Sequence, residues 1–204
     1  ILSLVVILSY IHRAPMISGP LEPVLAMTMT YLCIAPAGAA LSVDAWMRAR
    51  KSAGDASGSL DGQPSIDSVA ANISWRLIQV HLAGFYVMMA LNKLGGSEVW
   101  WTGQAVWQLI AKSETRLVDL TFMYPSEYLL NLWTHSIVLF ELAFGVLIWN
   151  RVARPLLLIA ALPVWGSLAL ITGLTSYCAM MLIVNLAFVS PAVLRSTRPG
   201  RQDE

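Results

Sequence analysis

The longest uncharged stretch of this 204-residue chain runs from Pro155 to Leu194 and contains 40 residues. As one α-helix it would extend about 60 Å, roughly twice the thickness of the hydrocarbon core of a bilayer. The short sequence TGLTS, at positions 172–176, is typical of a turn and divides the stretch into two helices. Two adjacent helices without a charge indicate an integral membrane protein.

Composition agrees, because charged residues make up only 12% of the chain, whereas soluble domains have about 25%. The apolar residues 1–11 have no basic segment before them and predict the end of a span whose beginning is missing from this sequence. The predicted fold class is therefore an all-α polytopic helical bundle with one truncated N-terminal span and about five full spans. The full spans are expected at 23–43, 73–94, 129–149, 155–173 and 175–194.

Residues 1–195 are predicted to form a single transmembrane domain. It contains a flexible cytoplasmic loop at about 47–70, rich in Gly, Ser and Asp, and a polar cytoplasmic tail follows at 196–204. Cys33 and Cys178 lie in apolar runs without metal-ligand spacing, so no metal site is expected. The expected partners are the lipid bilayer and a lipid-soluble small molecule; nucleic acid is not expected, and the sequence identifies no protein partner.

The distribution of basic residues predicts the orientation of the spans. In the proposed topology one side of the membrane collects eight Lys or Arg residues and the other collects three. Since cytoplasmic segments are enriched in basic residues, the C-terminus should be cytoplasmic and the end of the span that carries Lys93 should be exoplasmic. The cytoplasmic set is Arg48, Arg50, Lys51, Arg151, Arg154, Arg195, Arg198 and Arg201, and the exoplasmic set is Arg13, Lys112 and Arg116.

The span 73–94 carries more polar side chains than contact with lipid allows. At about 100° per residue, Gln79, Tyr86 and Lys93 fall within about 40° of one another, with Arg76 beside them. Other polar groups lie on the opposite side of the same helix. Because intramembrane ionisable groups normally face an interior or a wet cavity, this helix should be central in the bundle.

The next span adds Glu141 and His135. Distances along the two predicted spans place Glu141 closer in depth to Arg76 and Gln79 than to Lys93. We therefore expect Glu141 to pair with Arg76 or Gln79. His135 lies about 9 Å inside the exoplasmic end, close enough to share a proton with Lys93 through water.

Each polar group also has a structural explanation. Lys93 could extend its amine to the lipid headgroups, Arg76 could be a cytoplasmic anchor, and the partner of Glu141 could be purely structural. The segment 99–110 could lie on the membrane surface as an amphipathic helix. Three tryptophans suit an interfacial aromatic belt: Trp100, Trp101 and Trp107.

The stretch SWRLIQVHLAGFYVMMALNKLGGSEVWWTGQAV resembles the core of the vitamin K-dependent γ-carboxylase superfamily, including its bacterial relatives, the horizontally transferred transmembrane (HTTM) proteins. LSVDAW at 41–46 and LFELAFGVLIWNRVARP at 139–155 are similar to further steps of that pattern. Val164-Trp165 stands where the animal enzymes have a Phe-His pair. The family pattern falls on Arg76, Gln79, Tyr86, Lys93, Trp100 or Trp101, and Gly103.

The resemblance implies a membrane enzyme, in the bacterial inner membrane, whose lysine acts as a base. As a neutral amine, Lys93 would deprotonate a reduced quinone such as vitamin K. We expect His135 to share that proton. The residues expected to line the substrate cavity are Arg76, Gln79, Tyr86, Glu141 and Trp101.

Two further functional classes stay open. The chain could be a non-enzymatic membrane module that assembles with a partner, for which a bundle without chemistry suffices. It could also be a transporter, because Pro36 and Pro163 lie inside spans and suit broken helices. No internal repeat supports the transporter hypothesis.

Overall fold

A computed structural model describes residues 2–13, 19–34, 69–114 and 116–189 of the chain. Every regular element in these ranges is a helix, as the all-α prediction requires. The loop predicted at about 47–70 lies outside them up to position 68, as do the LSVDAW stretch and the tail at 196–204, and α4 begins at Val69. The α-helices are α1 (Leu2–Arg13), α2 (Leu21–Ile34), α4 (Val69–Gly96), α5 (Glu98–Trp101), α6 (Ala105–Ala111), α7 (Glu127–Leu147), α8 (Ala153–Thr172) and α9 (Thr175–Asn185), with 3₁₀ turns η2 (Thr121–Met123) and η3 (Leu186–Phe188).

Three of these helices, α4, α7 and α8, are long and apolar enough to cross a bilayer. With 28, 21 and 20 residues, they extend about 42, 31 and 30 Å at 1.5 Å per residue. The apolar helices α1, α2 and Thr175–Phe188 are shorter. The predicted ends of two spans, 35–43 and 190–194, fall outside the described residues. The structure therefore fits a membrane protein and supports three of the predicted spans.

The chain divides into two compact units, Ile1–Ile78 and Gln79–Glu204. In unit 1, α1 packs against α2. The carboxylate of Glu22 accepts a hydrogen bond of 2.7 Å from the backbone N–H of Gly19, just before α2. Helix α4 begins in unit 1 and contributes its residues from Gln79 onward to unit 2.

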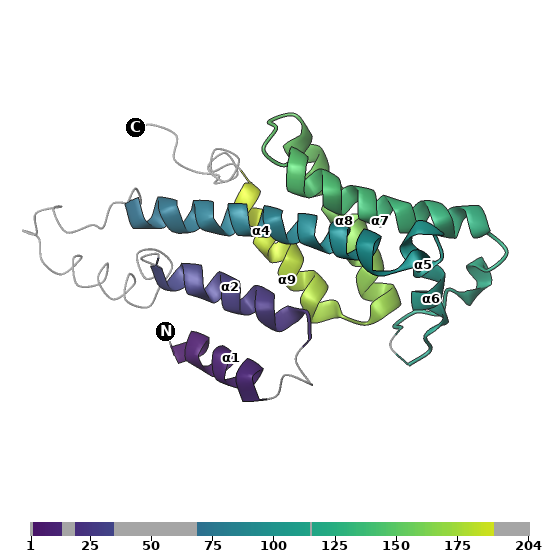
Figure 1. The fold of residues 1–204 in the computed structure, drawn as a ribbon, viewed down its shortest axis with the longest axis horizontal. Coiled ribbons are helices and arrows are strands. Elements are labelled where there is room, and N and C mark those ends of the chain that lie inside the picture. The colour runs from purple at the N-terminus through teal and green to yellow at the C-terminus, as the bar shows by residue number, and fades with distance from the viewer. Residues whose placement is uncertain (1, 14–18, 35–68, 115, 190–204) are drawn as a thin grey trace, which may run out of the picture. The chain divides into compact units, whose positions relative to one another are not determined.

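In unit 2, α7 runs antiparallel to α4 (Figure 1), and the two helices approach closely at Gly145. A Cβ atom at Gly145 would lie 2.4 Å from Cγ2 of Val87 and 2.9 Å from the carbonyl oxygen of Ala83. Only a residue without a side chain fits there, because real Cβ atoms do not approach other atoms so closely. This contact sets the register between α4 and α7.

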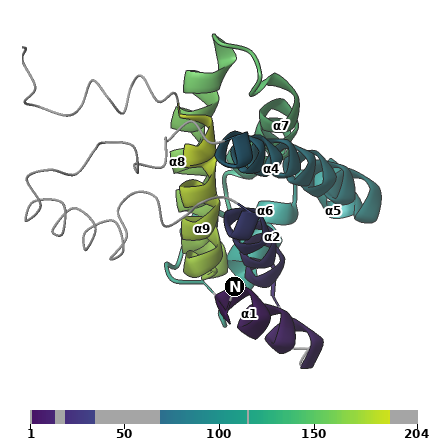
Figure 2. The same cartoon turned by 90° about the vertical axis from the view of Figure 1, so that its left-hand side faces the viewer.

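Helices α8 and α9 form a hairpin and lie side by side (Figure 2). Gly173 ends α8 with φ +70°, a left-handed conformation that glycine adopts without strain. The turn predicted at 172–176 is thus present. Helix α8 continues through Pro163, so the broken helix that would suit a transporter is absent at this proline.

The expected amphipathic helix at 99–110 is instead two short helices, α5 and α6, separated by a turn at Gly103. Gly103 has φ +76°, and a Cβ atom there would lie 2.6 Å from Oδ1 of Asn131. The hydroxyl of Thr134 donates to the carbonyl of Gly103 at 2.8 Å and accepts from the N–H of Val106 at 3.2 Å. The segment is therefore bonded to the first half of α7, and α6 buries Ala105, Val106 and Ile110.

Candidate functional site

The polar stripe of α4 contacts other helices of unit 2, as its spacing predicts. The side-chain amide of Gln79 donates to the carbonyl of Ala187 at 2.7 Å. The hydroxyl of Tyr86, which is fully buried, bonds to Asn185. Lys93, at the far end of the stripe, forms an ion pair with Glu141 of α7.

The Lys93–Glu141 pair combines one nearly inaccessible group with one that is partly open. The side chain of Glu141 is 1% exposed and that of Lys93 is 20% exposed. The amine of Lys93 also lies 4.9 Å from the ring centroid of Trp100, within the range of a cation–π interaction. Only Oε1 of Glu141 accepts from Lys93, and the buried Oε2 has no hydrogen-bond partner within the described residues.

This pairing differs from the expected contact of Glu141 with Arg76 or Gln79. The expected contact requires that α4 ends and α7 begins at the same level. In the structure, the first turns of α7 instead pack against α5 and α6. Because Gly145 packs against Val87, the α7 turn that precedes Gly145 lies beside the end of α4. Lys93 is therefore within reach of Glu141, while Arg76 lies about 25 Å further back along α4.

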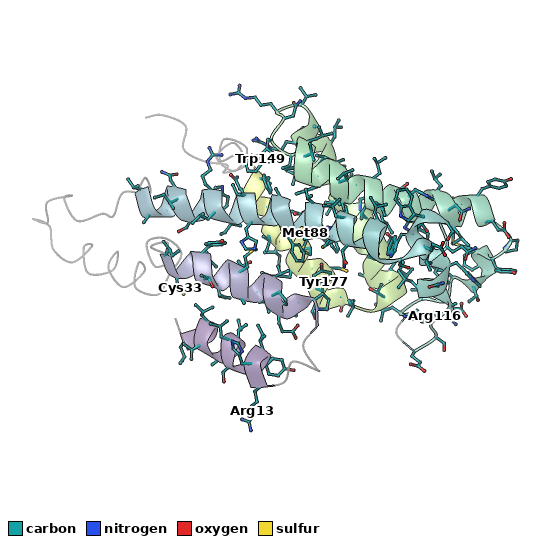
Figure 3. The ribbon with its side chains drawn as sticks, in the orientation of Figure 1. Arg13, Cys33, Met88, Arg116, Trp149 and Tyr177 are labelled. Atoms are coloured by element: carbon teal, nitrogen blue, oxygen red, sulfur yellow. The ribbon has the colours of Figure 1, made fainter. Side chains whose placement is uncertain are left out.

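A cavity of about 250 Å³ opens beside the pair. Helices α4, α5 and α7 supply Lys93, Trp100 and Glu141, and the α8–α9 hairpin supplies most of the opposite wall. Tyr177, labelled in Figure 3, belongs to that second wall. The cavity is thus apolar and aromatic with a single ion pair, and the main side chains from the hairpin are Trp165, Leu168, Thr172, Tyr177 and Cys178.

Several residues expected at the site lie elsewhere. Trp100 lines the cavity in the position expected for Trp101. Trp101 is 62% exposed and donates its indole N–H to the carbonyl of Leu94 at 2.6 Å, which satisfies a free carbonyl at the end of α4. Arg76, Gln79 and Tyr86 are not among the residues that line the cavity.

His135 is not brought to Lys93. Its ring is exposed, and Nδ1 bonds to the carbonyl of Asn131 in the preceding turn of α7 at 2.7 Å. His135 precedes Glu141 by six positions, which places the two side chains about 120° apart around the helix. The structure therefore pairs Lys93 with a carboxylate and gives the histidine a local bond.

A second polar cluster, which the sequence pattern did not predict, adjoins the cavity through Trp165. The hydroxyl of Tyr86 accepts from the indole N–H of Trp165 at 2.7 Å and from the amide N–H of Asn185 at 2.9 Å. The Tyr86 ring stacks on Phe144, with ring centroids 4.1 Å apart. A polar Asn185 in an apolar run was the available signal, because a buried amide needs partners. The Tyr86–Trp165–Asn185 network thus ties α4 to α8 and α9.

Within the described residues, the arrangement provides a cation, a buried carboxylate oxygen without a hydrogen-bond partner and an apolar hollow at one place. Within the described ranges, no group of three His, Cys, Asp or Glu residues is placed to hold a metal ion. Comparisons with models of protein families, with curated proteins and with solved structures found no match to this chain.

Proposed function

We propose that this chain is a multi-pass membrane protein of the vitamin K-dependent γ-carboxylase-like superfamily, with the C-terminus in the cytoplasm and Lys93 toward the exoplasmic side. Three membrane-length helices and the asymmetric basic residues support this topology. The ordered likeness around Lys93 supports the family. The functional part of the proposal concerns the Lys93–Glu141 cavity.

We propose that the cavity binds a small, mostly apolar molecule that carries a hydroxyl group. The observation that supports it best is Oε2 of Glu141, a buried oxygen of a cavity-lining residue that has no hydrogen-bond partner among the described residues. An unsatisfied buried acceptor costs about 1–3 kcal/mol. A ligand hydroxyl can donate to this oxygen and accept from the Lys93 amine, whereas a ketone or an ether supplies no donor.

A reduced quinone fits this description, since it has hydroxyl groups on an aromatic body. The aromatic wall formed by Trp100, Trp165 and Tyr177 suits the faces of such a ring. Bound there, a quinol would supply an acidic hydroxyl and two electrons. The protein residues would bind the ring, exclude water and receive the proton.

The ion pair supplies a route for that proton. An ammonium is not a base, so Lys93 must first lose a proton, and Glu141 is the carboxylate in direct contact with it. The transfer leaves a neutral amine beside a neutral acid, which suits an apolar wall. The amine then takes the hydroxyl proton of the ligand. The regenerated ammonium lies next to the charge that develops on the ligand oxygen.

The test uses purified full-length protein in lipid nanodiscs and two assays. Binding of 1-naphthol is compared with binding of its methyl ether, and oxygen uptake is followed with reduced 2-methylnaphthoquinone, where dioxygen receives the two electrons. We expect naphthol to bind about tenfold more tightly than the ether, and oxygen uptake to exceed that of empty nanodiscs. One lost hydrogen bond to a charged group corresponds to about that factor.

The variant Lys93→Arg distinguishes the hypothesis that Lys93 acts as a base from the hypothesis that it is only a positively charged anchor. Arginine preserves a cation beside Glu141 but does not lose its proton, so naphthol binding should persist while oxygen uptake falls to background. Circular dichroism and size-exclusion chromatography establish that the variant folds. Equal affinity for naphthol and its ether would refute hydroxyl recognition, and unchanged oxygen uptake in Lys93→Arg would refute the base. The pair would then join helices in a non-enzymatic module.

A further inference from the structure

A second hollow of about 270 Å³ lies in unit 2 where α7 begins. It is separate from the Lys93–Glu141 cavity, with which it shares no lining residue. The turn between α5 and α6 supplies Gln104, α6 supplies Trp107, and the first two turns of α7 supply Glu127 and Asn131. Tyr124, just before α7, adds a second aromatic side chain to the wall.

Of the polar side chains that line this hollow, Thr102 donates to the carbonyl of Val99 at 3.3 Å, and most of the others have no internal partner among the described residues. Within the described part of the chain, the side chains of Gln104, Glu127 and Asn131 make no hydrogen bond or ion pair. The indole N–H of Trp107 also has no hydrogen-bond partner among the described residues. Two amides and a carboxylate that line one hollow, with no internal partner in the described part of the chain, can bind a ligand.

Two aromatic rings form a corner of the same wall. The ring centroids of Trp107 and Tyr124 are 4.9 Å apart, and the ring planes meet at 46°. A tilted pair presents two ring faces at an angle to a group placed between them. Tryptophan and tyrosine faces attract organic cations through their negative quadrupole, and Trp does so most strongly.

The negative charge of the wall favours cationic ligands over anionic and neutral ones. Among the described residues, Glu127 is the one carboxylate that lines the hollow, and no Lys, Arg or His from these ranges lines it. An anion would therefore meet a carboxylate without a compensating cation. A neutral sugar would use the amides and rings but would gain little from the charge. A ligand ammonium uses all three features, since its N–H groups donate to the carboxylate and to the amide oxygens.

We propose that this hollow binds an organic ammonium group, with Glu127 as its counter-ion and Trp107 and Tyr124 as its aromatic walls. The position suggests where the ammonium comes from. Tyr128, the residue after Glu127, is 93% exposed, and Phe122 is exposed on the same segment. Exposed aromatic residues at the end of a membrane-length helix are typical of the headgroup level of a bilayer. The expected source is a phospholipid with a primary amine in its headgroup.

The experiment is calorimetric titration of the full-length protein in detergent with four probes. These are short-chain phosphatidylethanolamine, the matched phosphatidylcholine and phosphatidylglycerol, and free ethanolamine. We expect phosphatidylethanolamine to bind more tightly than phosphatidylglycerol by tenfold or more. Phosphatidylcholine should be intermediate, because its cation can contact the rings but donates no N–H bond.

Two substitutions test the wall directly. Glu127→Gln and Trp107→Leu should each weaken phosphatidylethanolamine binding about fivefold, a factor typical of one exposed ion pair or one cation–π contact. Glu114→Gln is the matched control, since Glu114 is exposed and does not line the hollow. Circular dichroism checks that each variant folds. Titration of the variants with 1-naphthol checks that the Lys93–Glu141 cavity is intact.

The outcomes show whether the hollow binds an ammonium group and whether that group belongs to a lipid or to a soluble amine. If free ethanolamine binds as tightly as the short-chain lipid, the ligand is a soluble amine, and if the lipid binds at least tenfold more tightly, it is the headgroup. Both results support an ammonium site. Equal binding of phosphatidylglycerol, no binding of any amine, or the same affinity in Glu127→Gln as in Glu114→Gln would overturn the proposal.

Discussion

Two buried polar clusters of unit 2 share one residue, Trp165, and differ in whether their polar groups have hydrogen-bond partners. The Tyr86–Trp165–Asn185 network is neutral, and its hydroxyl, indole and amide groups bond to one another across three helices. The Lys93–Glu141 pair is charged and leaves Oε2 of Glu141 without a hydrogen-bond partner in the described part of the chain. Trp165 belongs to both, because its N–H enters the network while its ring lines the cavity.

The difference separates a structural cluster from a candidate site. A closed neutral network contributes about 1 kcal/mol per hydrogen bond and fixes the positions of the helices. A buried ion pair contributes little net stability, because desolvation of both charges offsets their attraction. An acceptor left open beside a cavity therefore has no evident role in stability and points instead to a ligand.

The largest effect should come from breaking the pair. Glu141→Leu leaves the ammonium of Lys93 without its counter-ion in a largely apolar wall, and we expect the free energy of unfolding to fall by about 3–4 kcal/mol. Lys93→Met combined with Glu141→Leu should recover most of that loss, because neither charge remains. Denaturant unfolding of the purified protein in detergent, followed by circular dichroism, measures these two variants and the single variant Lys93→Met, which completes the cycle.

Glu114→Leu is the matched control for this cycle, since Glu114 is exposed. It should change the free energy of unfolding by less than about 0.5 kcal/mol. Strict additivity of the Glu141 and Lys93 substitutions would mean that the two side chains do not interact. In that case Lys93 and Glu141 would not form a charged cluster that can be compared with the neutral network.

A smaller loss should follow from opening the network. Tyr86→Phe removes the hydroxyl shared by Trp165 and Asn185, so two buried donors lose their acceptor, and we expect a loss of about 2 kcal/mol. Binding of 1-naphthol to the cavity should stay within about twofold, because the ion pair is unchanged. Thermal unfolding and calorimetric titration measure the two quantities.

Tyr128→Phe is the control, because Tyr128 is almost fully exposed. If Tyr86→Phe abolished naphthol binding while stability stayed at the wild-type value, the network would be part of the binding site. The two clusters would then be one.

The smallest effect is expected at His135. Its side chain is exposed and bonds only to the preceding turn of its own helix within the described structure, so His135→Ala should change stability by less than about 0.5 kcal/mol. Oxygen uptake with reduced 2-methylnaphthoquinone should also be unchanged. A large drop in uptake with normal folding would restore the histidine as the group that shares the proton of Lys93.

Helical periodicity was sufficient to find the inner face of α4. Gln79, Tyr86 and Lys93 are spaced by seven positions, and two turns of a helix return to nearly the same side. All three side chains contact α7 or the end of the α8–α9 hairpin. This success depends only on geometry within one helix, which the sequence specifies locally.

The partner of Glu141 depended on geometry between helices, which no local pattern contains. The predicted contact of Glu141 with Arg76 or Gln79 requires that neighbouring helices begin in one plane. The turn at Gly103 and its bonds to Thr134 instead place α5 and α6 beside the first half of α7. The same limitation applies to Trp100 and Trp101, because which of two adjacent tryptophans faces a cavity depends on where α5 begins.

The tight connection at Gly173 has a consequence for how such a site can change. Helices α8 and α9 carry most of the uncharged wall of the cavity on one continuous hairpin, whereas the amine and the carboxylate lie on α4 and α7. Leu168 or Thr172 can therefore become larger or smaller without separating the two charges. Substitutions in the hairpin alone would change the shape of the cavity, while the Lys93–Glu141 pair, the proposed route for the proton, would stay in place.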